Sequence, residues 1–216
     1  MTHNFGWLTA AFLPTVVTSL VVGSKPDKPV PFGCKIAWLA IRSESPREVA
    51  DALGLVKIRD SSWSDGLQAA GRGDVFVSPP VHGWVLAVST SLPDAGDERS
   101  TDRCTPLLAR LGKRFPDVQY FATHRVVEYH AWARVKNGAV DRQFAYLGER
   151  GEVSWNSGPQ TPEEVRLGFK FNPEKGPYPD EEDVLHLAEA WSVNPGKLDA
   201  LGLPPSLGLA GRFPDR

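Results

Sequence analysis

The sequence lacks the short motifs by which many enzyme classes are identified. It contains no P-loop and no GxGxxG, which disfavours nucleotide binding through a glycine-rich loop, and it contains no GxSxG nucleophile elbow. Its two cysteines, Cys34 and Cys104, have neither a CxxC nor a metal-type spacing. We therefore expect unpaired thiols and a cytoplasmic protein, with a single long-range disulfide as the alternative.

The chain also lacks a charge excess and a long uninterrupted apolar run. With 24 basic and 26 acidic residues, its net charge is -2, so no global basic field would attract nucleic acid or an anionic membrane. Residues 5–23 carry no charge, but Pro14 and four threonines and serines interrupt them and no basic region precedes them. We interpret this stretch as a packed or irregular arm, with a secretory or membrane role as the alternative.

The clearest structural signal lies in residues 118–147, where two runs rich in aromatic and β-branched residues flank Asn137-Gly138. This pattern predicts a long strand, a type I′ turn and a return strand. The turn fixes a register in which the facing pairs are Val135 with Val140, Arg134 with Asp141, Ala131 with Phe144, and Tyr129 with Tyr146.

Other elements follow from their boundary residues. Residues 35–42 form an apolar run typical of a buried strand, and Ser45, Pro46 and Gly54 then predict a helix over residues 46–53. Further along the chain we expect a short strand and a long loop in 55–73, a hairpin in 74–89, a helix over about 105–114, and two helices starting after Thr161 and at Asp180.

This order of elements predicts an α+β fold. We expect an antiparallel sheet with helices packed on one face, in a ferredoxin-like β-α-β-β-α-β core extended by the long β-hairpin and a C-terminal helical segment. Other layouts of an antiparallel sheet with helices on one side stay open. Residues 1–31 would form an apolar arm and a proline-rich connector, 32–199 a single domain, and 200–216 an irregular tail.

A binding surface is predicted on the long strand. If residues 118–136 form one strand, one of its faces mixes aromatic rings with titratable groups, which is typical of binding grooves. Two further tryptophans lie in a loop and beside a turn. The predicted binding residues are His124, Glu128, His130, Trp132, Trp63 and Trp155. The alternative is that the tryptophans belong to the core.

Glu128 and His130 also allow the hypothesis of an enzymatic site. Two residues apart on a strand, they would emerge on the same side about 7 Å apart, and both could bind one metal ion. A third ligand would have to come from elsewhere, such as His82, Asp65 or Glu152. The alternative is that Glu128 and His130 hydrogen-bond to each other or to the neighbouring strands. We expect no cofactor, and the sequence does not decide whether Glu128 and His130 bind a metal ion.

Four segments carry a resemblance: GDVFVSPPVHGWVLAV (73–88), YFATHRVVEYHAWARV (120–135), FAYLGERGEV (144–153) and DEEDVLHLAEAWSV (180–193). They resemble a family of bacterial proteins with no established function. The resemblance covers roughly residues 35–199, implies a bacterial origin and a single domain, and transfers no residue role.

No complete catalytic set is visible in the sequence. The leading hypothesis is therefore a non-enzymatic bacterial protein-binding domain of the immunity type, which neutralises a toxin, with a protein partner and without nucleic acid or membrane. The alternative is a small metal-assisted or acid-base hydrolase that uses Glu128 and His130.

Overall fold

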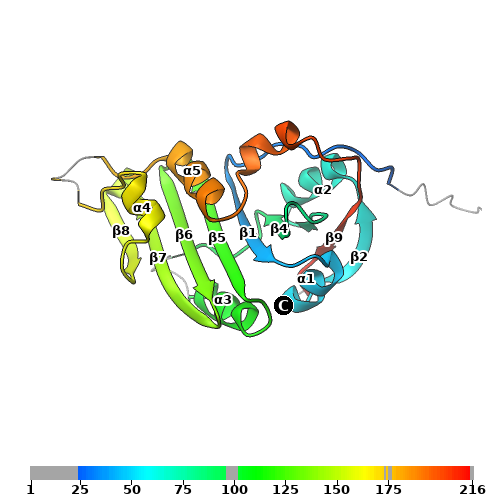
Figure 1. The fold of residues 1–216 in the computed structure, drawn as a ribbon, viewed down its shortest axis with the longest axis horizontal. Coiled ribbons are helices and arrows are strands. Elements are labelled where there is room, and N and C mark those ends of the chain that lie inside the picture. The colour runs from blue at the N-terminus through cyan, green and yellow to red at the C-terminus, as the bar shows by residue number, and fades with distance from the viewer. Residues whose placement is uncertain (1–23, 96–101, 173, 175–176, 215–216) are drawn as a thin grey trace, which may run out of the picture.

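The computed structural model describes residues 24–95, 102–172, 174 and 177–214 (Figure 1). The apolar stretch 5–23 lies outside these residues. The strands are β1 (Ile36–Arg42), β2 (Val56–Ser61), β3 (Val75–Val77), β4 (Trp84–Ser89), β5 (Asp117–His124), β6 (Tyr129–Lys136), β7 (Ala139–Leu147), β8 (Glu152–Ser157) and β9 (Gly208–Arg212). The helices are α1 (Pro46–Leu53), α2 (Trp63–Ala70), α3 (Cys104–Gly112), α4 (Pro162–Arg166) and α5 (Glu181–Trp191), with 3-10 turns η1 (Gly148–Arg150) and η3 (Pro195–Leu201).

The strands form one nine-stranded sheet in the order β2-β9-β3-β4-β1-β5-β6-β7-β8, and every neighbouring pair is antiparallel. The α+β class and the antiparallel sheet are therefore confirmed. The ferredoxin-like arrangement is not confirmed, because the sheet is larger and its second position is taken by the C-terminal strand β9.

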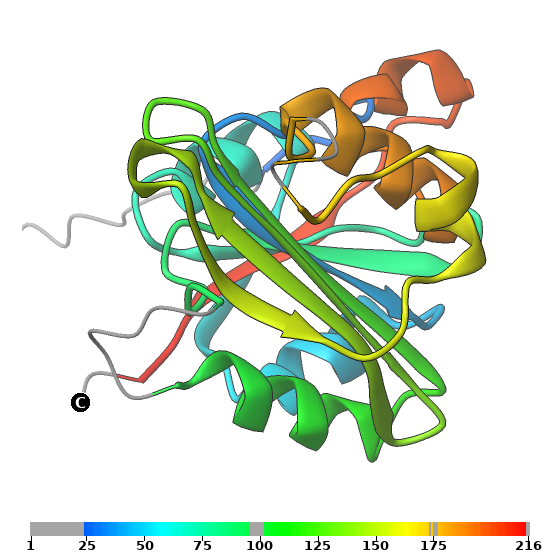
Figure 2. The ribbon, with the colours of Figure 1, turned by 90° about the vertical axis from the view of Figure 1, so that its left-hand side faces the viewer.

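Helices cover both faces of the sheet, so the expectation that they pack on one face is wrong (Figure 2). Strand β1 shows why, since its side chains alternate between two cores. Leu39 and Ile41 pack with α1 and α3, whereas Trp38 and Ala40 pack with α2 and α5. We call these two sides the α1/α3 face and the α2/α5 face. A nearly continuous apolar run such as β1 suits a strand that is buried on both sides.

Two local predictions are confirmed in detail. Helix α1 spans Pro46–Leu53; the Ser45 side chain accepts a hydrogen bond from the Glu48 amide, and Gly54 ends the helix with a φ of 73°. In the long hairpin, Asn137 and Gly138 have φ values of 49° and 82°. Positive φ at both central residues is the requirement of a type I′ turn. The two cysteines are both free, as expected.

The predicted hairpin register is right next to the turn and wrong beyond it. Val135 pairs with Val140, but the register shifts between Arg134 and Val135 through a bulge. Arg134 pairs with Arg142, where Asp141 was predicted. Ala131 pairs with Ala145 instead of Phe144, and Tyr129 pairs with Leu147 instead of Tyr146. Asp141 still forms an ion pair with Arg134, at 2.9 Å.

Two segments that we expected to be irregular are ordered elements. Residues 63–70 form α2, which begins where the Ser62 side chain accepts a hydrogen bond from the Asp65 amide. In the tail 200–216, residues 208–212 form β9, which pairs with both β2 and β3. Gly208 permits this insertion, because a Cβ atom there would overlap the carbonyl oxygen of Val77.

Throughout residues 24–95, 102–172, 174 and 177–214, each helix is too short or too polar to cross a membrane.

Candidate functional site

The predicted single strand over residues 118–136 is in fact two strands. β5 ends at His124, a turn follows over residues 125–128, and β6 returns antiparallel from Tyr129. In this turn, the amide of Val127 donates to the carbonyl of His124 at 3.1 Å, and Glu128 adopts a φ of 50°. The reversal divides the predicted mixed face: His124 precedes the turn, and His130 lies on the partner strand.

The structure buries three of the predicted binding residues, His130 and two tryptophans. Trp132 and Trp63 have exposed fractions of 0% and 1%. The indole nitrogen of Trp132 donates to Glu164 at 2.7 Å, and the ring of Trp63 packs edge-on against Phe76. Both are core residues on the α2/α5 face, so their place in a partner surface is corrected. Trp155 is half-buried and packs against the core of the α1/α3 face.

Glu128 and His130 do not share a strand as the metal hypothesis required. Glu128 lies in the turn against Gly148, whereas His130 is buried with no hydrogen-bond partner for Nδ1 among the described residues. Burial lowers the pKa of His130, while nearby carboxylates, Asp180 and Glu181 foremost, oppose this shift. Within the described part of the chain, no group of three His, Cys, Asp or Glu side chains is placed to hold a metal ion.

A pocket of about 670 Å³ opens on the α1/α3 face, where β1 and β6 begin and β5 and β7 end. Its volume falls in the range of small-molecule binding sites. Its apolar lining consists of Ile36, Ala37, Leu92, Ala95, Ala122, Val127, Tyr129 and Leu147. Charged side chains of both signs surround this lining, namely Lys35, Arg150, Asp94 and Glu152, and the imidazole of His124 lies beside them.

A row of small side chains explains why the pocket exists. Ala37 of β1 faces Ala122 of β5, which faces Ala131 of β6, which faces Ala145 of β7. On the other side of Ala37 the row continues with Ser89 of β4. Because directly opposed residues share one face of an antiparallel sheet, this row removes side-chain volume along a line across five strands. The pocket lies at Ser89, Ala37 and Ala122.

Tyr129 fixes one wall of the pocket. Its hydroxyl donates to the carbonyl oxygen of Ala95 and accepts from the amide of Ala95, both at 2.8 Å. Burial raises the pKa of Tyr129, and the carboxylate of Asp94 raises it further. The hydroxyl therefore stays protonated at neutral pH and holds residues 91–95 at the pocket edge.

The polar groups of the pocket do not form a catalytic set. The Ser89 hydroxyl donates to the carbonyl of Asp74 at 2.7 Å, and the Thr123 hydroxyl to the carbonyl of Gly33. Arg150 and Glu152 form an exposed ion pair at 4.0 Å. Among the described residues, no hydroxyl or thiol is hydrogen-bonded to a histidine, which is the arrangement that activates a nucleophile.

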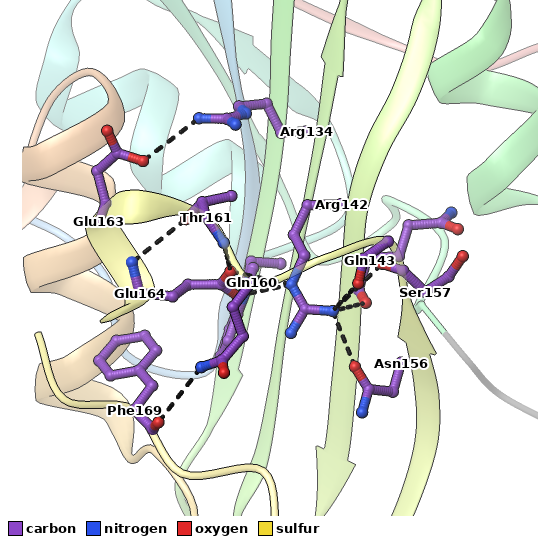
Figure 3. A network of polar contacts seen from close by, with 12 residues as sticks. Arg134, Arg142, Gln143, Asn156, Ser157, Gln160, Thr161, Glu163, Glu164 and Phe169 are labelled. Carbon is purple, nitrogen blue, oxygen red and sulfur yellow. Dashed lines mark hydrogen bonds and ion pairs between the residues drawn. The ribbon is translucent and has the colours of Figure 1, made fainter. Parts of the chain in front are cut away.

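The α2/α5 face carries a closed polar network (Figure 3). Arg142 and Glu164 form its centre and are almost fully buried, and Arg142 Nη1 also donates to Asn156 and to the carbonyl of Ser157. Thr161 and Glu164 cap α4 reciprocally. Because its members are mostly satisfied by one another, we assign the network to holding α4 and the end of β8 on the sheet.

No protein-family model, no curated protein and no solved structure matches the chain. The resemblance to a bacterial family thus gains no support from these comparisons. Of the pocket residues, sequence analysis singled out His124 and named Glu152 as a possible ligand. It missed the alanine row, because four alanines in four separate strands become neighbours only through long-range pairing.

Proposed function

We propose that the protein is a non-enzymatic binding protein whose pocket on the α1/α3 face receives an apolar side chain of a protein partner. The observation that carries this proposal is the pocket itself, with an alanine floor, a tyrosine wall and charged groups of both signs around it. Neutralisation of a toxin, as an immunity protein does, is the specific form of this function that we favour.

The pocket suits an anchor residue of a partner. Fully burying a large apolar side chain contributes roughly 1.5–3 kcal/mol, and such anchors dominate protein interfaces when water is excluded around them. Lys35, His124 and Arg150 are exposed and can reach a partner's polar groups. Charges around an apolar centre set orientation and choice of partner more than affinity.

The predicted binding residues contribute unequally to this proposal. His124 lines the pocket, and Glu128 is exposed in the turn beside it. Trp63, Trp132 and His130 are buried on the opposite face and take no part. The free thiols of Cys34 and Cys104 fit a cytoplasmic location. The hydrolase that would use Glu128 and His130 stays a prediction, and no arrangement of the described residues favours it.

A pocket-filling variant tests the proposal. Ser154 is half-buried on β8 and lines the pocket, so Ser154→Trp would occupy it. Val165 on α4 is exposed on the other side of the molecule, which makes Val165→Trp the matched control. Tagged protein would be used to capture partners from a lysate of the source organism. We expect a stoichiometric protein to be retained by the wild type and by Val165→Trp and lost with Ser154→Trp. Equal retention by all three would contradict the proposal.

A further inference from the structure

A second pocket, of about 480 Å³, lies beside the first. The described residues that line it are Ser91, Pro93, Arg103, Leu107, Arg110 and Phe213. The two pockets share no lining residue, yet they share a wall. In the loop 91–95, Leu92, Asp94 and Ala95 line the first pocket, whereas Ser91 and Pro93 line the second. A partner seated in the first pocket would therefore extend naturally over the second.

The charge of the second pocket has one sign. Arg103 and Arg110 are its charged residues among those described, and both are exposed. Neither guanidinium group forms an ion pair or hydrogen bond with another described residue, unlike those of Arg134 and Arg142 on the opposite face. Guanidinium groups that no described residue neutralises are available to an external carboxylate, which they bind with a planar pair of donors.

The distance between the two arginines sets the spacing of the negative charges that a peptide ligand would need. Arg103 is the N-cap residue that precedes α3, and Arg110 lies seven positions later, so their backbones are about 10 Å apart along the helix axis. Leu107 lies between them, and Phe213 follows the end of β9 on the other side of the pocket. In a peptide of polyproline II conformation, which has three residues per turn, side chains three positions apart lie on the same side and are separated by roughly 9 Å.

We propose that the second pocket binds an acidic segment of the protein partner, with two carboxylates three residues apart and an apolar side chain between them. The carboxylates would pair with Arg103 and Arg110, and the apolar side chain would contact Leu107 and Phe213. The inference rests on the proposed function, because it takes the partner to be a protein. A net charge of -2 gives the chain no wide basic field, so an isolated pair of arginines suits a short acidic peptide better than a nucleic acid or a membrane.

A random dodecapeptide library displayed on phage supplies the probe. It would be selected on the intact wild-type chain, and the selected peptides would be titrated against Arg103→Glu/Arg110→Glu and against the control Arg166→Glu. Arg166 is exposed on α4, on the opposite face. We expect selected peptides to contain Asp or Glu pairs at the stated spacing. The double variant should bind them at least about tenfold more weakly and the control should not, with affinity falling as salt rises.

Three results would overturn the inference: selected peptides without acidic pairs, equal binding by the double variant, or full displacement by inorganic phosphate at constant ionic strength, which would assign the site to small anions. Thermal unfolding of each variant shows whether folding is intact. Ser154→Trp should leave acidic peptide binding unchanged. If a cellular partner is lost with Ser154→Trp and kept by the double variant, the proposed function stands and this inference fails.

Discussion

The Nε atom of Arg142 lies 2.8 and 3.0 Å from the two carboxylate oxygens of Glu164, and both side chains are almost fully buried. Glu164 also accepts hydrogen bonds from the indole of Trp132 and the amide of Thr161, at 2.7 and 2.6 Å. These contacts join α4 to β6 and β7. Taking either charge away would leave the other buried in a medium of low dielectric constant, which is costly.

We therefore expect Glu164→Gln to lower the free energy of unfolding by roughly 3–5 kcal/mol. Urea denaturation would measure the change. The exposed ion pair of Arg47 and Asp51 on α1, at 3.2 Å, supplies the control, because Asp51→Asn should change stability by less than about 0.5 kcal/mol. Similar losses in the two variants would show that burial does not decide the strength of the Arg142–Glu164 pair.

Replacing His130 by Gln should reduce the sensitivity of the fold to mild acid. Burial lowers the pKa of His130 below its ordinary 6.5, so the unfolded chain binds more protons than the folded protein just below that pH. The stability that neutral His130 contributes is thus complete above 6.5 and decreases as the pH falls toward the folded-state pKa. Between about pH 7.5 and about pH 5.5, urea denaturation should show a larger loss in the wild type than in His130→Gln. An identical loss would contradict this assignment.

Cys34 should become more reactive when Glu181 is changed to Gln. The thiol of Cys34 donates to Glu181 at 3.1 Å, and this hydrogen bond is the main cause that raises its pKa, followed by burial. The thiolate is the nucleophile, so removing the carboxylate should increase iodoacetamide modification at about pH 8 by roughly threefold or more. Cys104 is the internal control, because it is buried and should stay unmodified in the folded protein. A slower reaction in Glu181→Gln would refute the prediction.

Gly66 in α2 and Gly71, which caps the C-terminus of α2, should respond oppositely to alanine. A Cβ atom on Gly66 would overlap the ring of Phe76, so Gly66→Ala should cost about 1–3 kcal/mol despite the better helix propensity of alanine. Gly71 has an ordinary helical φ of -64°, and its nearest neighbouring atom would lie 3.6 Å from a Cβ. Gly71→Ala should be neutral or stabilising by up to ~1 kcal/mol. Thermal unfolding of both variants tests the pair, and a stabilising Gly66→Ala would contradict the close packing of α2 on β3.

Local signals in the sequence predicted local structure well. The cap at Ser45, the end of α1 at Gly54 and the turn at Asn137-Gly138 each depend on the chemistry of adjacent residues. The break between β5 and β6 was missed because residues 125–128 contain no glycine or proline, and Glu128 adopts a positive φ that glutamate rarely takes. One unpredicted bulge, between Arg134 and Val135, shifted the register of every pair farther from the turn.

The candidate site was largely beyond sequence reasoning because it depends on pairing between distant strands. The alanine row joins residues 37, 122, 131 and 145, and a pattern search within any one strand shows only a small apolar residue. Trp63 and Trp132 attracted attention as large aromatic residues, but size favours burial as much as binding. The pocket is instead marked by small residues, whose shared position appears only once the register is known.

The position of β9 has a consequence for synthesis of the protein on the ribosome. It follows β2 and β3 in the chain by more than a hundred residues, yet it fills the place between them. Until residues 208–212 have emerged, the nascent chain therefore exposes two unpaired strand edges, which are templates for association with other chains. Completion of the sheet waits for residues 208–212, so the edges of β2 and β3 need shielding from other chains until those residues are available.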